Sequence, residues 1–219
     1  MKDLFNQIKI FKSNSHYRLG DLIFLKGDRC LHDRKIILNN PEYEGTFLRL
    51  YLESKNPFKK IDKNTLKKCI ESLKNRVNLD ENALYINMRL GDCVMHSYGK
   101  SIGLFLYFPD KLYSKIYEKL NQNKGIKKIE IVSALHFGDN EFKKIWQFSE
   151  EAVDENRIRF NDIIQTIKGR FNLPISIHQN EKRQVDHIDE DFLTLSLAKH
   201  SITDSGGFGD VINIARSIV

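Results

Sequence analysis

The sequence has few cysteines and prolines, and it lacks a long apolar run. Its 219 residues include four prolines and three cysteines, Cys30, Cys69 and Cys93. An odd number of cysteines without a C-x-x-C pair argues against a disulfide framework and a zinc site. The apolar run at 104–108 is far shorter than the roughly 18 residues of a membrane span, and the first residues lack a secretory signal. We therefore expect a globular, cytoplasmic protein without a transmembrane segment or a bound metal.

The excess of positive charge is confined to one segment. The chain has 35 Lys and Arg against 29 Asp and Glu, a formal net charge of +6. Residues 54–76 hold eight of the basic residues and two of the acidic ones, which accounts for all of that excess. Because the rest of the chain is neutral, a uniformly basic nucleic-acid-binding protein is excluded. The Lys-rich segment is either a solvated helix face or a surface for an anionic partner.

Short apolar runs alternate with amphipathic stretches from residue 83 onward, a pattern typical of a parallel sheet flanked by helices. Strands are expected at 83–88, 129–133, 174–178 and 201–204. Helices are expected after the capping residues Asp110, Asp139 and Asp189, along the apolar stripe of 160–171, and over 210–219. This order predicts one α/β, Rossmann-like lobe over 83–219.

The first 80 residues are less regular. One amphipathic helix is expected there, with an apolar face formed by Leu66, Cys69, Ile70, Leu73 and Val77. A domain boundary is expected at 78–82, which makes residues 1–80 a small N-terminal lobe.

A glycine-rich turn follows the last predicted strand, in the sequence Ser205-Gly206-Gly207-Phe208-Gly209. Backbone N–H groups of such a turn, placed before a helix N-terminus, can bind the oxygens of a diphosphate, and a Cβ would hinder that approach. The alternative is an ordinary turn between strand and helix, with glycines for close packing.

A second candidate segment, Asn87 to Asp92, ends the first predicted strand of the lobe. In open α/β sheets, ligands bind beyond the carboxyl ends of the strands, so Arg89 can reach the crevice that the glycine turn faces. A guanidinium binds a diphosphate in bidentate fashion and stays charged at any working pH. The alternative is a structural pair between Arg89 and Asp92.

Together the two segments resemble the fucosyltransferase superfamily of glycosyltransferases. Those enzymes carry H-x-R-R-G-D on one strand and D-L-x-L-M-S-x-C-K-H-x-I-x-x-S-S-F-S further on. Arg89, Gly91 and Asp92 match the first motif. The second is matched by Asp191, Leu195 (in place of Met), Ser196, Lys199, His200, Ile202 and Phe208. Residues 16–24 are similar to the acceptor-side segment of the family. The resemblance implies a GT-B-like fold whose N-terminal lobe, 1–80, is reduced.

What the resemblance implies chemically is a metal-independent, inverting transfer of fucose or another hexose to a glycan or similar hydroxyl. Arg89 would neutralise the leaving nucleoside diphosphate. Asp92 would orient Arg89 or act as the general base, and His96 and Asp21 are further candidates for the base. Residues expected at the donor are Asn87, Gly91, Asp191, Ser196, Ser205, Gly206, Gly207, Phe208 and Gly209.

The donor is less well defined, because the sequence departs from the family motifs. Asn87 stands in place of the family His and Leu90 in place of the second Arg. The T-D-S-G-G sequence of 203–207 is similar to that of UDP-N-acetylglucosamine 2-epimerases. Both resemblances imply a diphosphate at the turn. A GDP-linked donor is favoured over a UDP-linked one, and no further cofactor is expected.

Two alternatives remain. Asp189-Glu190-Asp191 is formally a metal-binding D-x-D motif, but the helical pattern after it favours a helix cap. The replacement of the family His by Asn87 and of the second Arg by Leu90 favours a non-catalytic nucleotide-sugar-binding lobe, or one subunit of a larger assembly.

Overall fold

The computed structural model describes residues 63, 66–67, 70–71, 74–90, 96–133, 137, 149–178 and 186–219. Several sequence predictions lie outside these residues: Asp21, Gly91, Asp92, and the helix expected after Asp139. The side chain of His96 is also outside the description.

The chain divides into two compact units. One consists of the described residues within Leu79–Lys182 and Ala198–Gly209, and it contains the sheet. The other consists of those within Arg183–Leu197 and Asp210–Val219, with the described residues up to Asn78. The predicted division into lobes at 1–80 and 83–219 stays a prediction.

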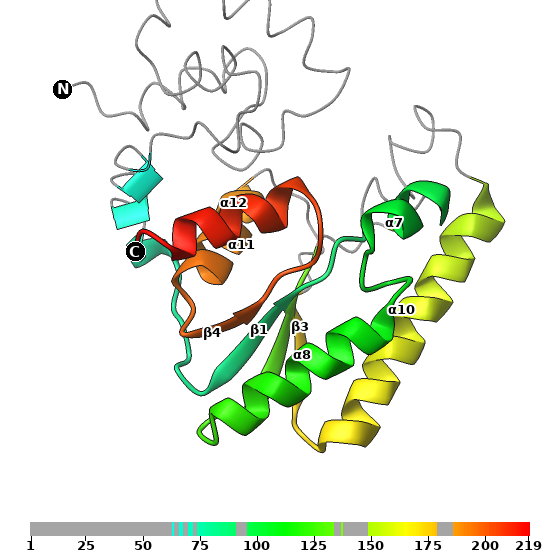
Figure 1. The fold of residues 1–219 in the computed structure, drawn as a ribbon, viewed down its shortest axis with the longest axis horizontal. Coiled ribbons are helices and arrows are strands. Elements are labelled where there is room, and N and C mark those ends of the chain that lie inside the picture. Colours follow the sequence, from blue (N-terminus) through cyan, green and yellow to red (C-terminus); the bar gives the residue numbers. More distant parts are fainter. Residues whose placement is uncertain are drawn as a thin grey trace, which may run out of the picture. The chain divides into compact units, whose positions relative to one another are not determined.

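The sheet of the first unit has four parallel strands in the order β3-β2-β1-β4 (Figure 1). The strands are β1 (Ala83–Asn87), β2 (Lys128–Val132), β3 (Ile175–His178) and β4 (His200–Ile202). The four predicted strands are therefore confirmed, with small differences at their ends. An all-parallel sheet with intervening helices is the Rossmann-like α/β arrangement that the alternating pattern predicts.

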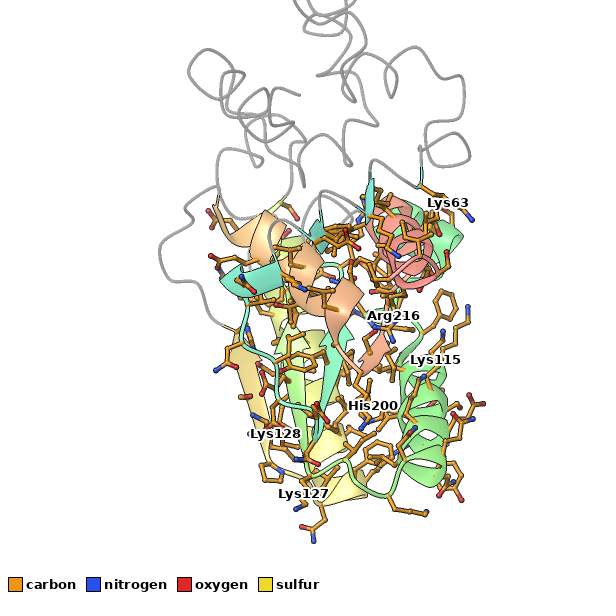
Figure 2. The ribbon with its side chains drawn as sticks, turned by 90° about the vertical axis from the view of Figure 1, so that its left-hand side faces the viewer. Lys63, Lys115, Lys127, Lys128, His200 and Arg216 are labelled. Atoms are coloured by element: carbon orange, nitrogen blue, oxygen red, sulfur yellow. The ribbon has the colours of Figure 1, made fainter. Side chains whose placement is uncertain are left out.

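Helices α8 (Pro109–Gln122) and α10 (Glu150–Phe171) contribute to one continuous core with the sheet (Figure 1). Side chains alternate between the two faces of a strand, so one set from each strand meets these helices. The buried core includes Leu84, Ile86, Ile129, Ile131, Ile202, Leu112, Ile116, Phe160, Ile163 and Ile167. His200 of β4 is also buried, between the sheet and α8 (labelled in Figure 2).

The boundaries of these helices correct two expectations. Asp110 lies in the first turn of α8 and is not its cap, because Pro109 already begins the helix and Phe108 precedes it. Helix α10 begins well before the predicted stripe, where the Ser149 hydroxyl accepts the N–H of Ala152 at 3.2 Å. The helix ends at Phe171, where the predicted stripe ends, and Asn172 caps it in the left-handed conformation with φ of 49°. A short helix, α7 (His96–Ile102), was not predicted, because its sequence has no apolar periodicity.

The second unit contains the short 3-10 helix η2 (Lys74–Arg76) and helix α11 (Asp186–Leu197), and helix α12 (Gly207–Arg216) lies mostly within it. The guanidinium of Arg216 donates to the carbonyl of Leu195 at 3.1 Å, which ties the end of α12 to α11. Asp189 is not the cap of α11, because the helix begins three residues earlier. The D-x-D sequence therefore lies on a helix and not at the end of a strand.

Only part of the Lys-rich segment 54–76 belongs to the described residues. Leu66 and Ile70 are fully buried and Lys63 and Lys67 are exposed, as expected of an amphipathic helix (Lys63 is labelled in Figure 2). Lys67 pairs with Glu71 one turn further on at 4.0 Å. Among the described helices, none is both long and apolar enough to cross a membrane.

Candidate functional site

The order of the strands defines where a ligand can bind. From β1 the chain continues to β2 and β3 on one side, and β4 then pairs with β1 on its other side. In open α/β sheets, ligands bind beyond the carboxyl ends of the strands on either side of such a reversal, which here are β1 and β4. Arg89 follows β1 and the turn Ser205–Gly206 follows β4, so both predicted segments lie at this reversal.

A buried carboxylate, Asp204, connects the backbone segments at this end of the sheet. Its side chain accepts the backbone N–H of Arg89 at 3.0 Å, of Phe105 at 2.9 Å and of Ser205 at 2.8 Å. These residues belong to the segment after β1, the connection between α7 and α8, and the turn after β4. Asp204 is 3% exposed, so the three bonds are shielded from water. It therefore fixes the relative positions of the segments that carry the site.

The titration of Asp204 reflects its burial. Loss of solvation raises its pKa to about 6, although the three N–H donors and the nearby charge of Arg89 act in the opposite direction. Asp204 is not among the predicted site residues, because an Asp at a strand end is common in turns. The signal that could have selected it is its position two residues after a buried strand and two residues before a pair of glycines.

Arg89 and Gly206 lie against each other. Gly206 has a φ of +107°, a conformation that residues with a Cβ rarely adopt. A Cβ added there would overlap Nη1 of Arg89, so the half-buried guanidinium occupies the space that the missing side chain leaves. The structure thus brings together two residues that the sequence separates widely, and the positive φ gives the glycine a conformational reason.

The glycine turn is shorter than predicted. Helix α12 begins at Gly207, so Gly207, Phe208 and Gly209 belong to its first turn, and only Ser205 and Gly206 form the turn before it. Ser205 is exposed, and its hydroxyl donates to the carbonyl of Gly103 at 3.4 Å. The first N–H groups of a helix have no partner within the helix, and they carry a partial positive charge. An anion in front of Gly207 would meet this charge and that of Arg89.

Gly209 serves packing. A Cβ at this position would overlap the backbone carbonyl oxygen of Asp204, so only glycine lets the start of α12 approach the end of β4 this closely. For Gly209 the alternative interpretation of the motif, close packing, therefore has direct steric support.

We expect Gly209→Ala to lower the free energy of unfolding by about 1–3 kcal/mol, because the backbone atoms that it meets cannot move aside without strain. Urea denaturation measures the change. The matched control is Gly169→Ala in α10, where an added Cβ meets nothing within 4 Å and alanine favours the helix by roughly 1 kcal/mol. Equal stabilities of the two variants would contradict the packing role.

The side chain of Asn87 forms a hydrogen bond within the sheet. It is 5% exposed, and its amide donates to the carbonyl of Val132 at 3.3 Å. Nearby, the hydroxyl of Ser133 donates to the carbonyl of Met88 at 2.5 Å. These two bonds tie the carboxyl ends of β1 and β2 together, which accounts for both buried polar side chains.

The remaining predicted donor residues lie on α11, in the other unit. Asp191 is half-buried and Ser196 is 2% exposed, with no hydrogen-bond partner for its hydroxyl in the part of the chain that the structure describes. Their predicted contact with a donor stays a prediction. Lys199 also matches the family motif. It is exposed, and its Nζ lies 3.6 Å from a carboxylate oxygen of Glu81.

The site offers cationic and N–H donor groups suited to an anion. Within the described ranges, no group of three or more His, Cys, Asp or Glu side chains is placed to bind a metal ion. The fold and this site define the chain as a Rossmann-like α/β protein with a candidate anion-binding site beyond β1 and β4. Comparisons with protein-family models, curated proteins and solved structures find no match to this chain.

Proposed function

We propose that this chain is a GT-B-like, metal-independent glycosyltransferase of the inverting type. It transfers fucose or another hexose from a nucleoside-diphosphate sugar to a hydroxyl of a glycan or similar acceptor. The observation that carries the proposal is the contact between Arg89 and Gly206 at the point where the strand order reverses. The sequence resemblance assigns both residues to the diphosphate, and this crevice is where α/β sheets bind such ligands.

The chemistry follows from the charges of the site. In an inverting transfer the acceptor oxygen attacks the anomeric carbon, and the bond from that carbon to the β-phosphate oxygen breaks. Negative charge then develops on the nucleoside diphosphate. Arg89 and the first N–H groups of α12 stabilise this charge, a role that a metal ion fills in other glycosyltransferases. The hydrogen bonds from the backbone of Arg89 and Ser205 to the buried Asp204 hold these two segments in position before the substrate arrives.

A GDP-linked donor is our first choice over a UDP-linked one. The fucosyltransferase resemblance extends over 83–219, whereas the epimerase resemblance rests on the five residues 203–207. The acceptor is a hydroxyl compound, and the Lys-rich segment 54–76 is a candidate surface for an anionic acceptor or partner.

One observation favours the second candidate function, a non-catalytic nucleotide-sugar-binding module. Asn87, which replaces the family His, donates its amide to the backbone of β2. An amide cannot transfer a proton as a histidine does. A chain that binds the donor without transferring the sugar would accord with this replacement.

The first test is thermal stabilisation by a panel of GDP, UDP and their sugar conjugates, with and without EDTA. A ligand at about 100 times its dissociation constant adds roughly 2.7 kcal/mol, which raises the melting temperature of a chain of this size by about 5–10 °C. We expect stabilisation by GDP compounds that EDTA does not change. The absence of any shift across the panel would contradict the proposal. A shift without sugar transfer or donor hydrolysis would favour the binding module.

A further inference from the structure

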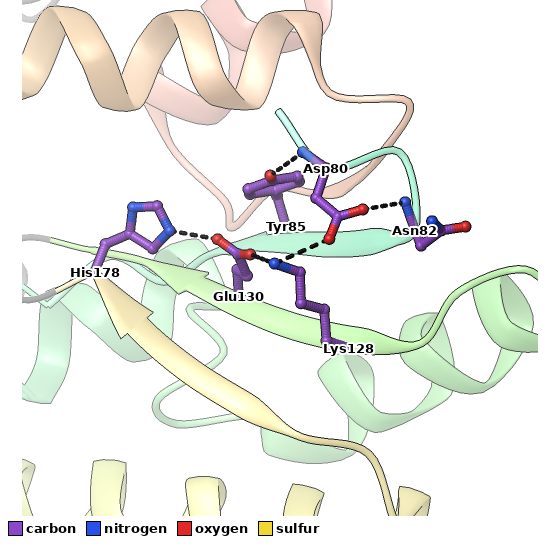
Figure 3. A network of polar contacts seen from close by, with 6 residues as sticks. All are labelled: Asp80, Asn82, Tyr85, Lys128, Glu130 and His178. Carbon is purple, nitrogen blue, oxygen red and sulfur yellow. Dashed lines mark hydrogen bonds and ion pairs between the residues drawn. The ribbon is translucent and has the colours of Figure 1, made fainter. Parts of the chain in front are cut away.

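A second polar cluster, with none of the residues of the site described above, lies on β1, β2 and β3 and on the segment just before β1. It consists of Asp80, Tyr85, Lys128, Glu130 and His178, and we name it the Glu130 cluster (Figure 3). Tyr85 and Glu130 are paired in the sheet register, and both alternate with side chains of the core, so they face away from α8 and α10. These hydrogen bonds and ion pairs link side chains from three strands on one face of the sheet.

Glu130 is the centre of the cluster. Its side chain is only 10% exposed, with one oxygen 2.5 Å from Lys128 Nζ and the other 2.5 Å from His178 Nε2. Burial opposes ionisation, yet the two partners hold the pKa of Glu130 below its ordinary value. Lys128 is itself fixed by Asp80 at 3.0 Å, and its pKa is raised by both carboxylates. Glu130 is therefore a carboxylate held ionised and in one orientation.

His178 brings a partly exposed side chain to the cluster. It is the last residue of β3, its side chain is 39% exposed, and its ring meets that of Tyr85 edge-on at 6.4 Å (Figure 3). The bond to Glu130 uses Nε2. In a neutral imidazole, an Nε2–H donated to a carboxylate leaves Nδ1 as the unprotonated nitrogen. The cluster therefore places an imidazole, with a carboxylate bonded to its Nε2, at the carboxyl end of β3.

We propose that His178 is the general base that deprotonates the acceptor hydroxyl. This inference rests on the proposed function. Nδ1 of His178 takes the hydroxyl proton while the oxygen forms its bond to the anomeric carbon. The nucleoside diphosphate leaves with the electron pair of the broken C–O bond and is stabilised by Arg89. Glu130 stabilises the imidazolium, which later releases its proton to water.

The arrangement of the strands fits this role. β3 is separated from β1 by β2 alone, so the strand carrying His178 and the strand that leads to Arg89 are about 10 Å apart. A base and a leaving-group stabiliser must flank the sugar from opposite sides in an inverting displacement. His178 ends β3 and Arg89 follows β1 at the same edge of the sheet, so the proposal puts the sugar between these two side chains.

The test compares His178→Ala with Ser176→Ala, which replaces an exposed residue on the same face of β3. We expect His178→Ala to lower kcat of sugar transfer by about 10²–10⁴, with little change in KM for the donor, and added imidazole to restore part of the rate. Glu130→Gln should lower kcat by a smaller factor. Ser176→Ala should leave kcat unchanged. Circular dichroism checks that each variant folds.

The outcomes separate this inference from the proposed function. Turnover by the wild type together with an unchanged kcat in His178→Ala overturns the base role alone. The variant could instead have a lower kcat that imidazole does not restore, together with a lower melting temperature. That result assigns His178 a structural role and also overturns the base role. If the wild type binds nucleotide diphosphates but transfers no sugar, the chain is a binding module and has no base. If the wild type binds none of them, the proposed function itself is wrong.

Discussion

Replacing Arg89 by alanine is expected to lower the rate of sugar transfer by about 10²–10³-fold. The guanidinium is the only side-chain cation assigned to the leaving diphosphate, and its removal leaves the backbone groups of the turn and of α12 to stabilise the developing charge. Steady-state kinetics with the donor identified by thermal stabilisation measures the loss. The variant should also lose most of the stabilisation that a nucleoside diphosphate gives.

The matched control is Arg170→Ala on α10. The Arg170 guanidinium lies over the ring of Tyr113 at 4.4 Å, so this variant removes an arginine from the same unit without touching the crevice. Its rate should equal that of the wild type. Full turnover in a folded Arg89→Ala variant would refute the assignment of the crevice to the diphosphate.

The pH dependence of stability should change when Asp204 is replaced by asparagine. The pKa of Asp204 is raised from 3.8 to about 6 in the folded chain, so between these values the folded state binds more protons than the unfolded state. The contribution of Asp204 to stability is therefore fully present below pH 3.8 and is lost as the pH rises through 6. Relative to Asp204→Asn, the wild type should lose about 2–3 kcal/mol of unfolding free energy between pH 4 and pH 7.

Urea denaturation of both proteins at several pH values measures this difference. Asparagine does not titrate, so any constant cost of the substitution cancels in the comparison. Asp80→Asn is a control of opposite sign, because backbone bonding to Asn82 and the contact with Lys128 lower the pKa of Asp80. Relative to that variant, the wild type should gain stability as the pH rises. A parallel pH dependence of the wild type and Asp204→Asn would contradict the raised pKa.

Much of the fold could be predicted from local patterns. Ile129 and Ile131, like Leu84 and Ile86, belong to short apolar runs that fit a buried parallel strand, and the structure confirms both strands. The helix around Phe160 was predicted from its stripe, but its first turns were missed because few of their side chains reach the core. The first residues of the helices were the least accurate part of the prediction, since an Asp can either cap a helix or lie in its first turn.

Less of the candidate site could be predicted. Arg89 and Gly206 were selected from the sequence, and the structure places them in contact. Asp204 and the Glu130 cluster were missed, because their significance comes from partners distant in the chain. Glu130 and His178 are 48 residues apart, and neither belongs to a recognisable motif.

The sequence by itself determined the alternation of strands and helices, because apolar periodicity depends only on neighbouring residues. It also determined which residues follow the strands and can carry chemistry. Only the tertiary structure decided that β4 pairs with β1, and that Asp204 is the buried acceptor for three backbone segments. Strand order and the burial of a carboxylate depend on contacts between distant parts of the chain, and no local pattern specifies them.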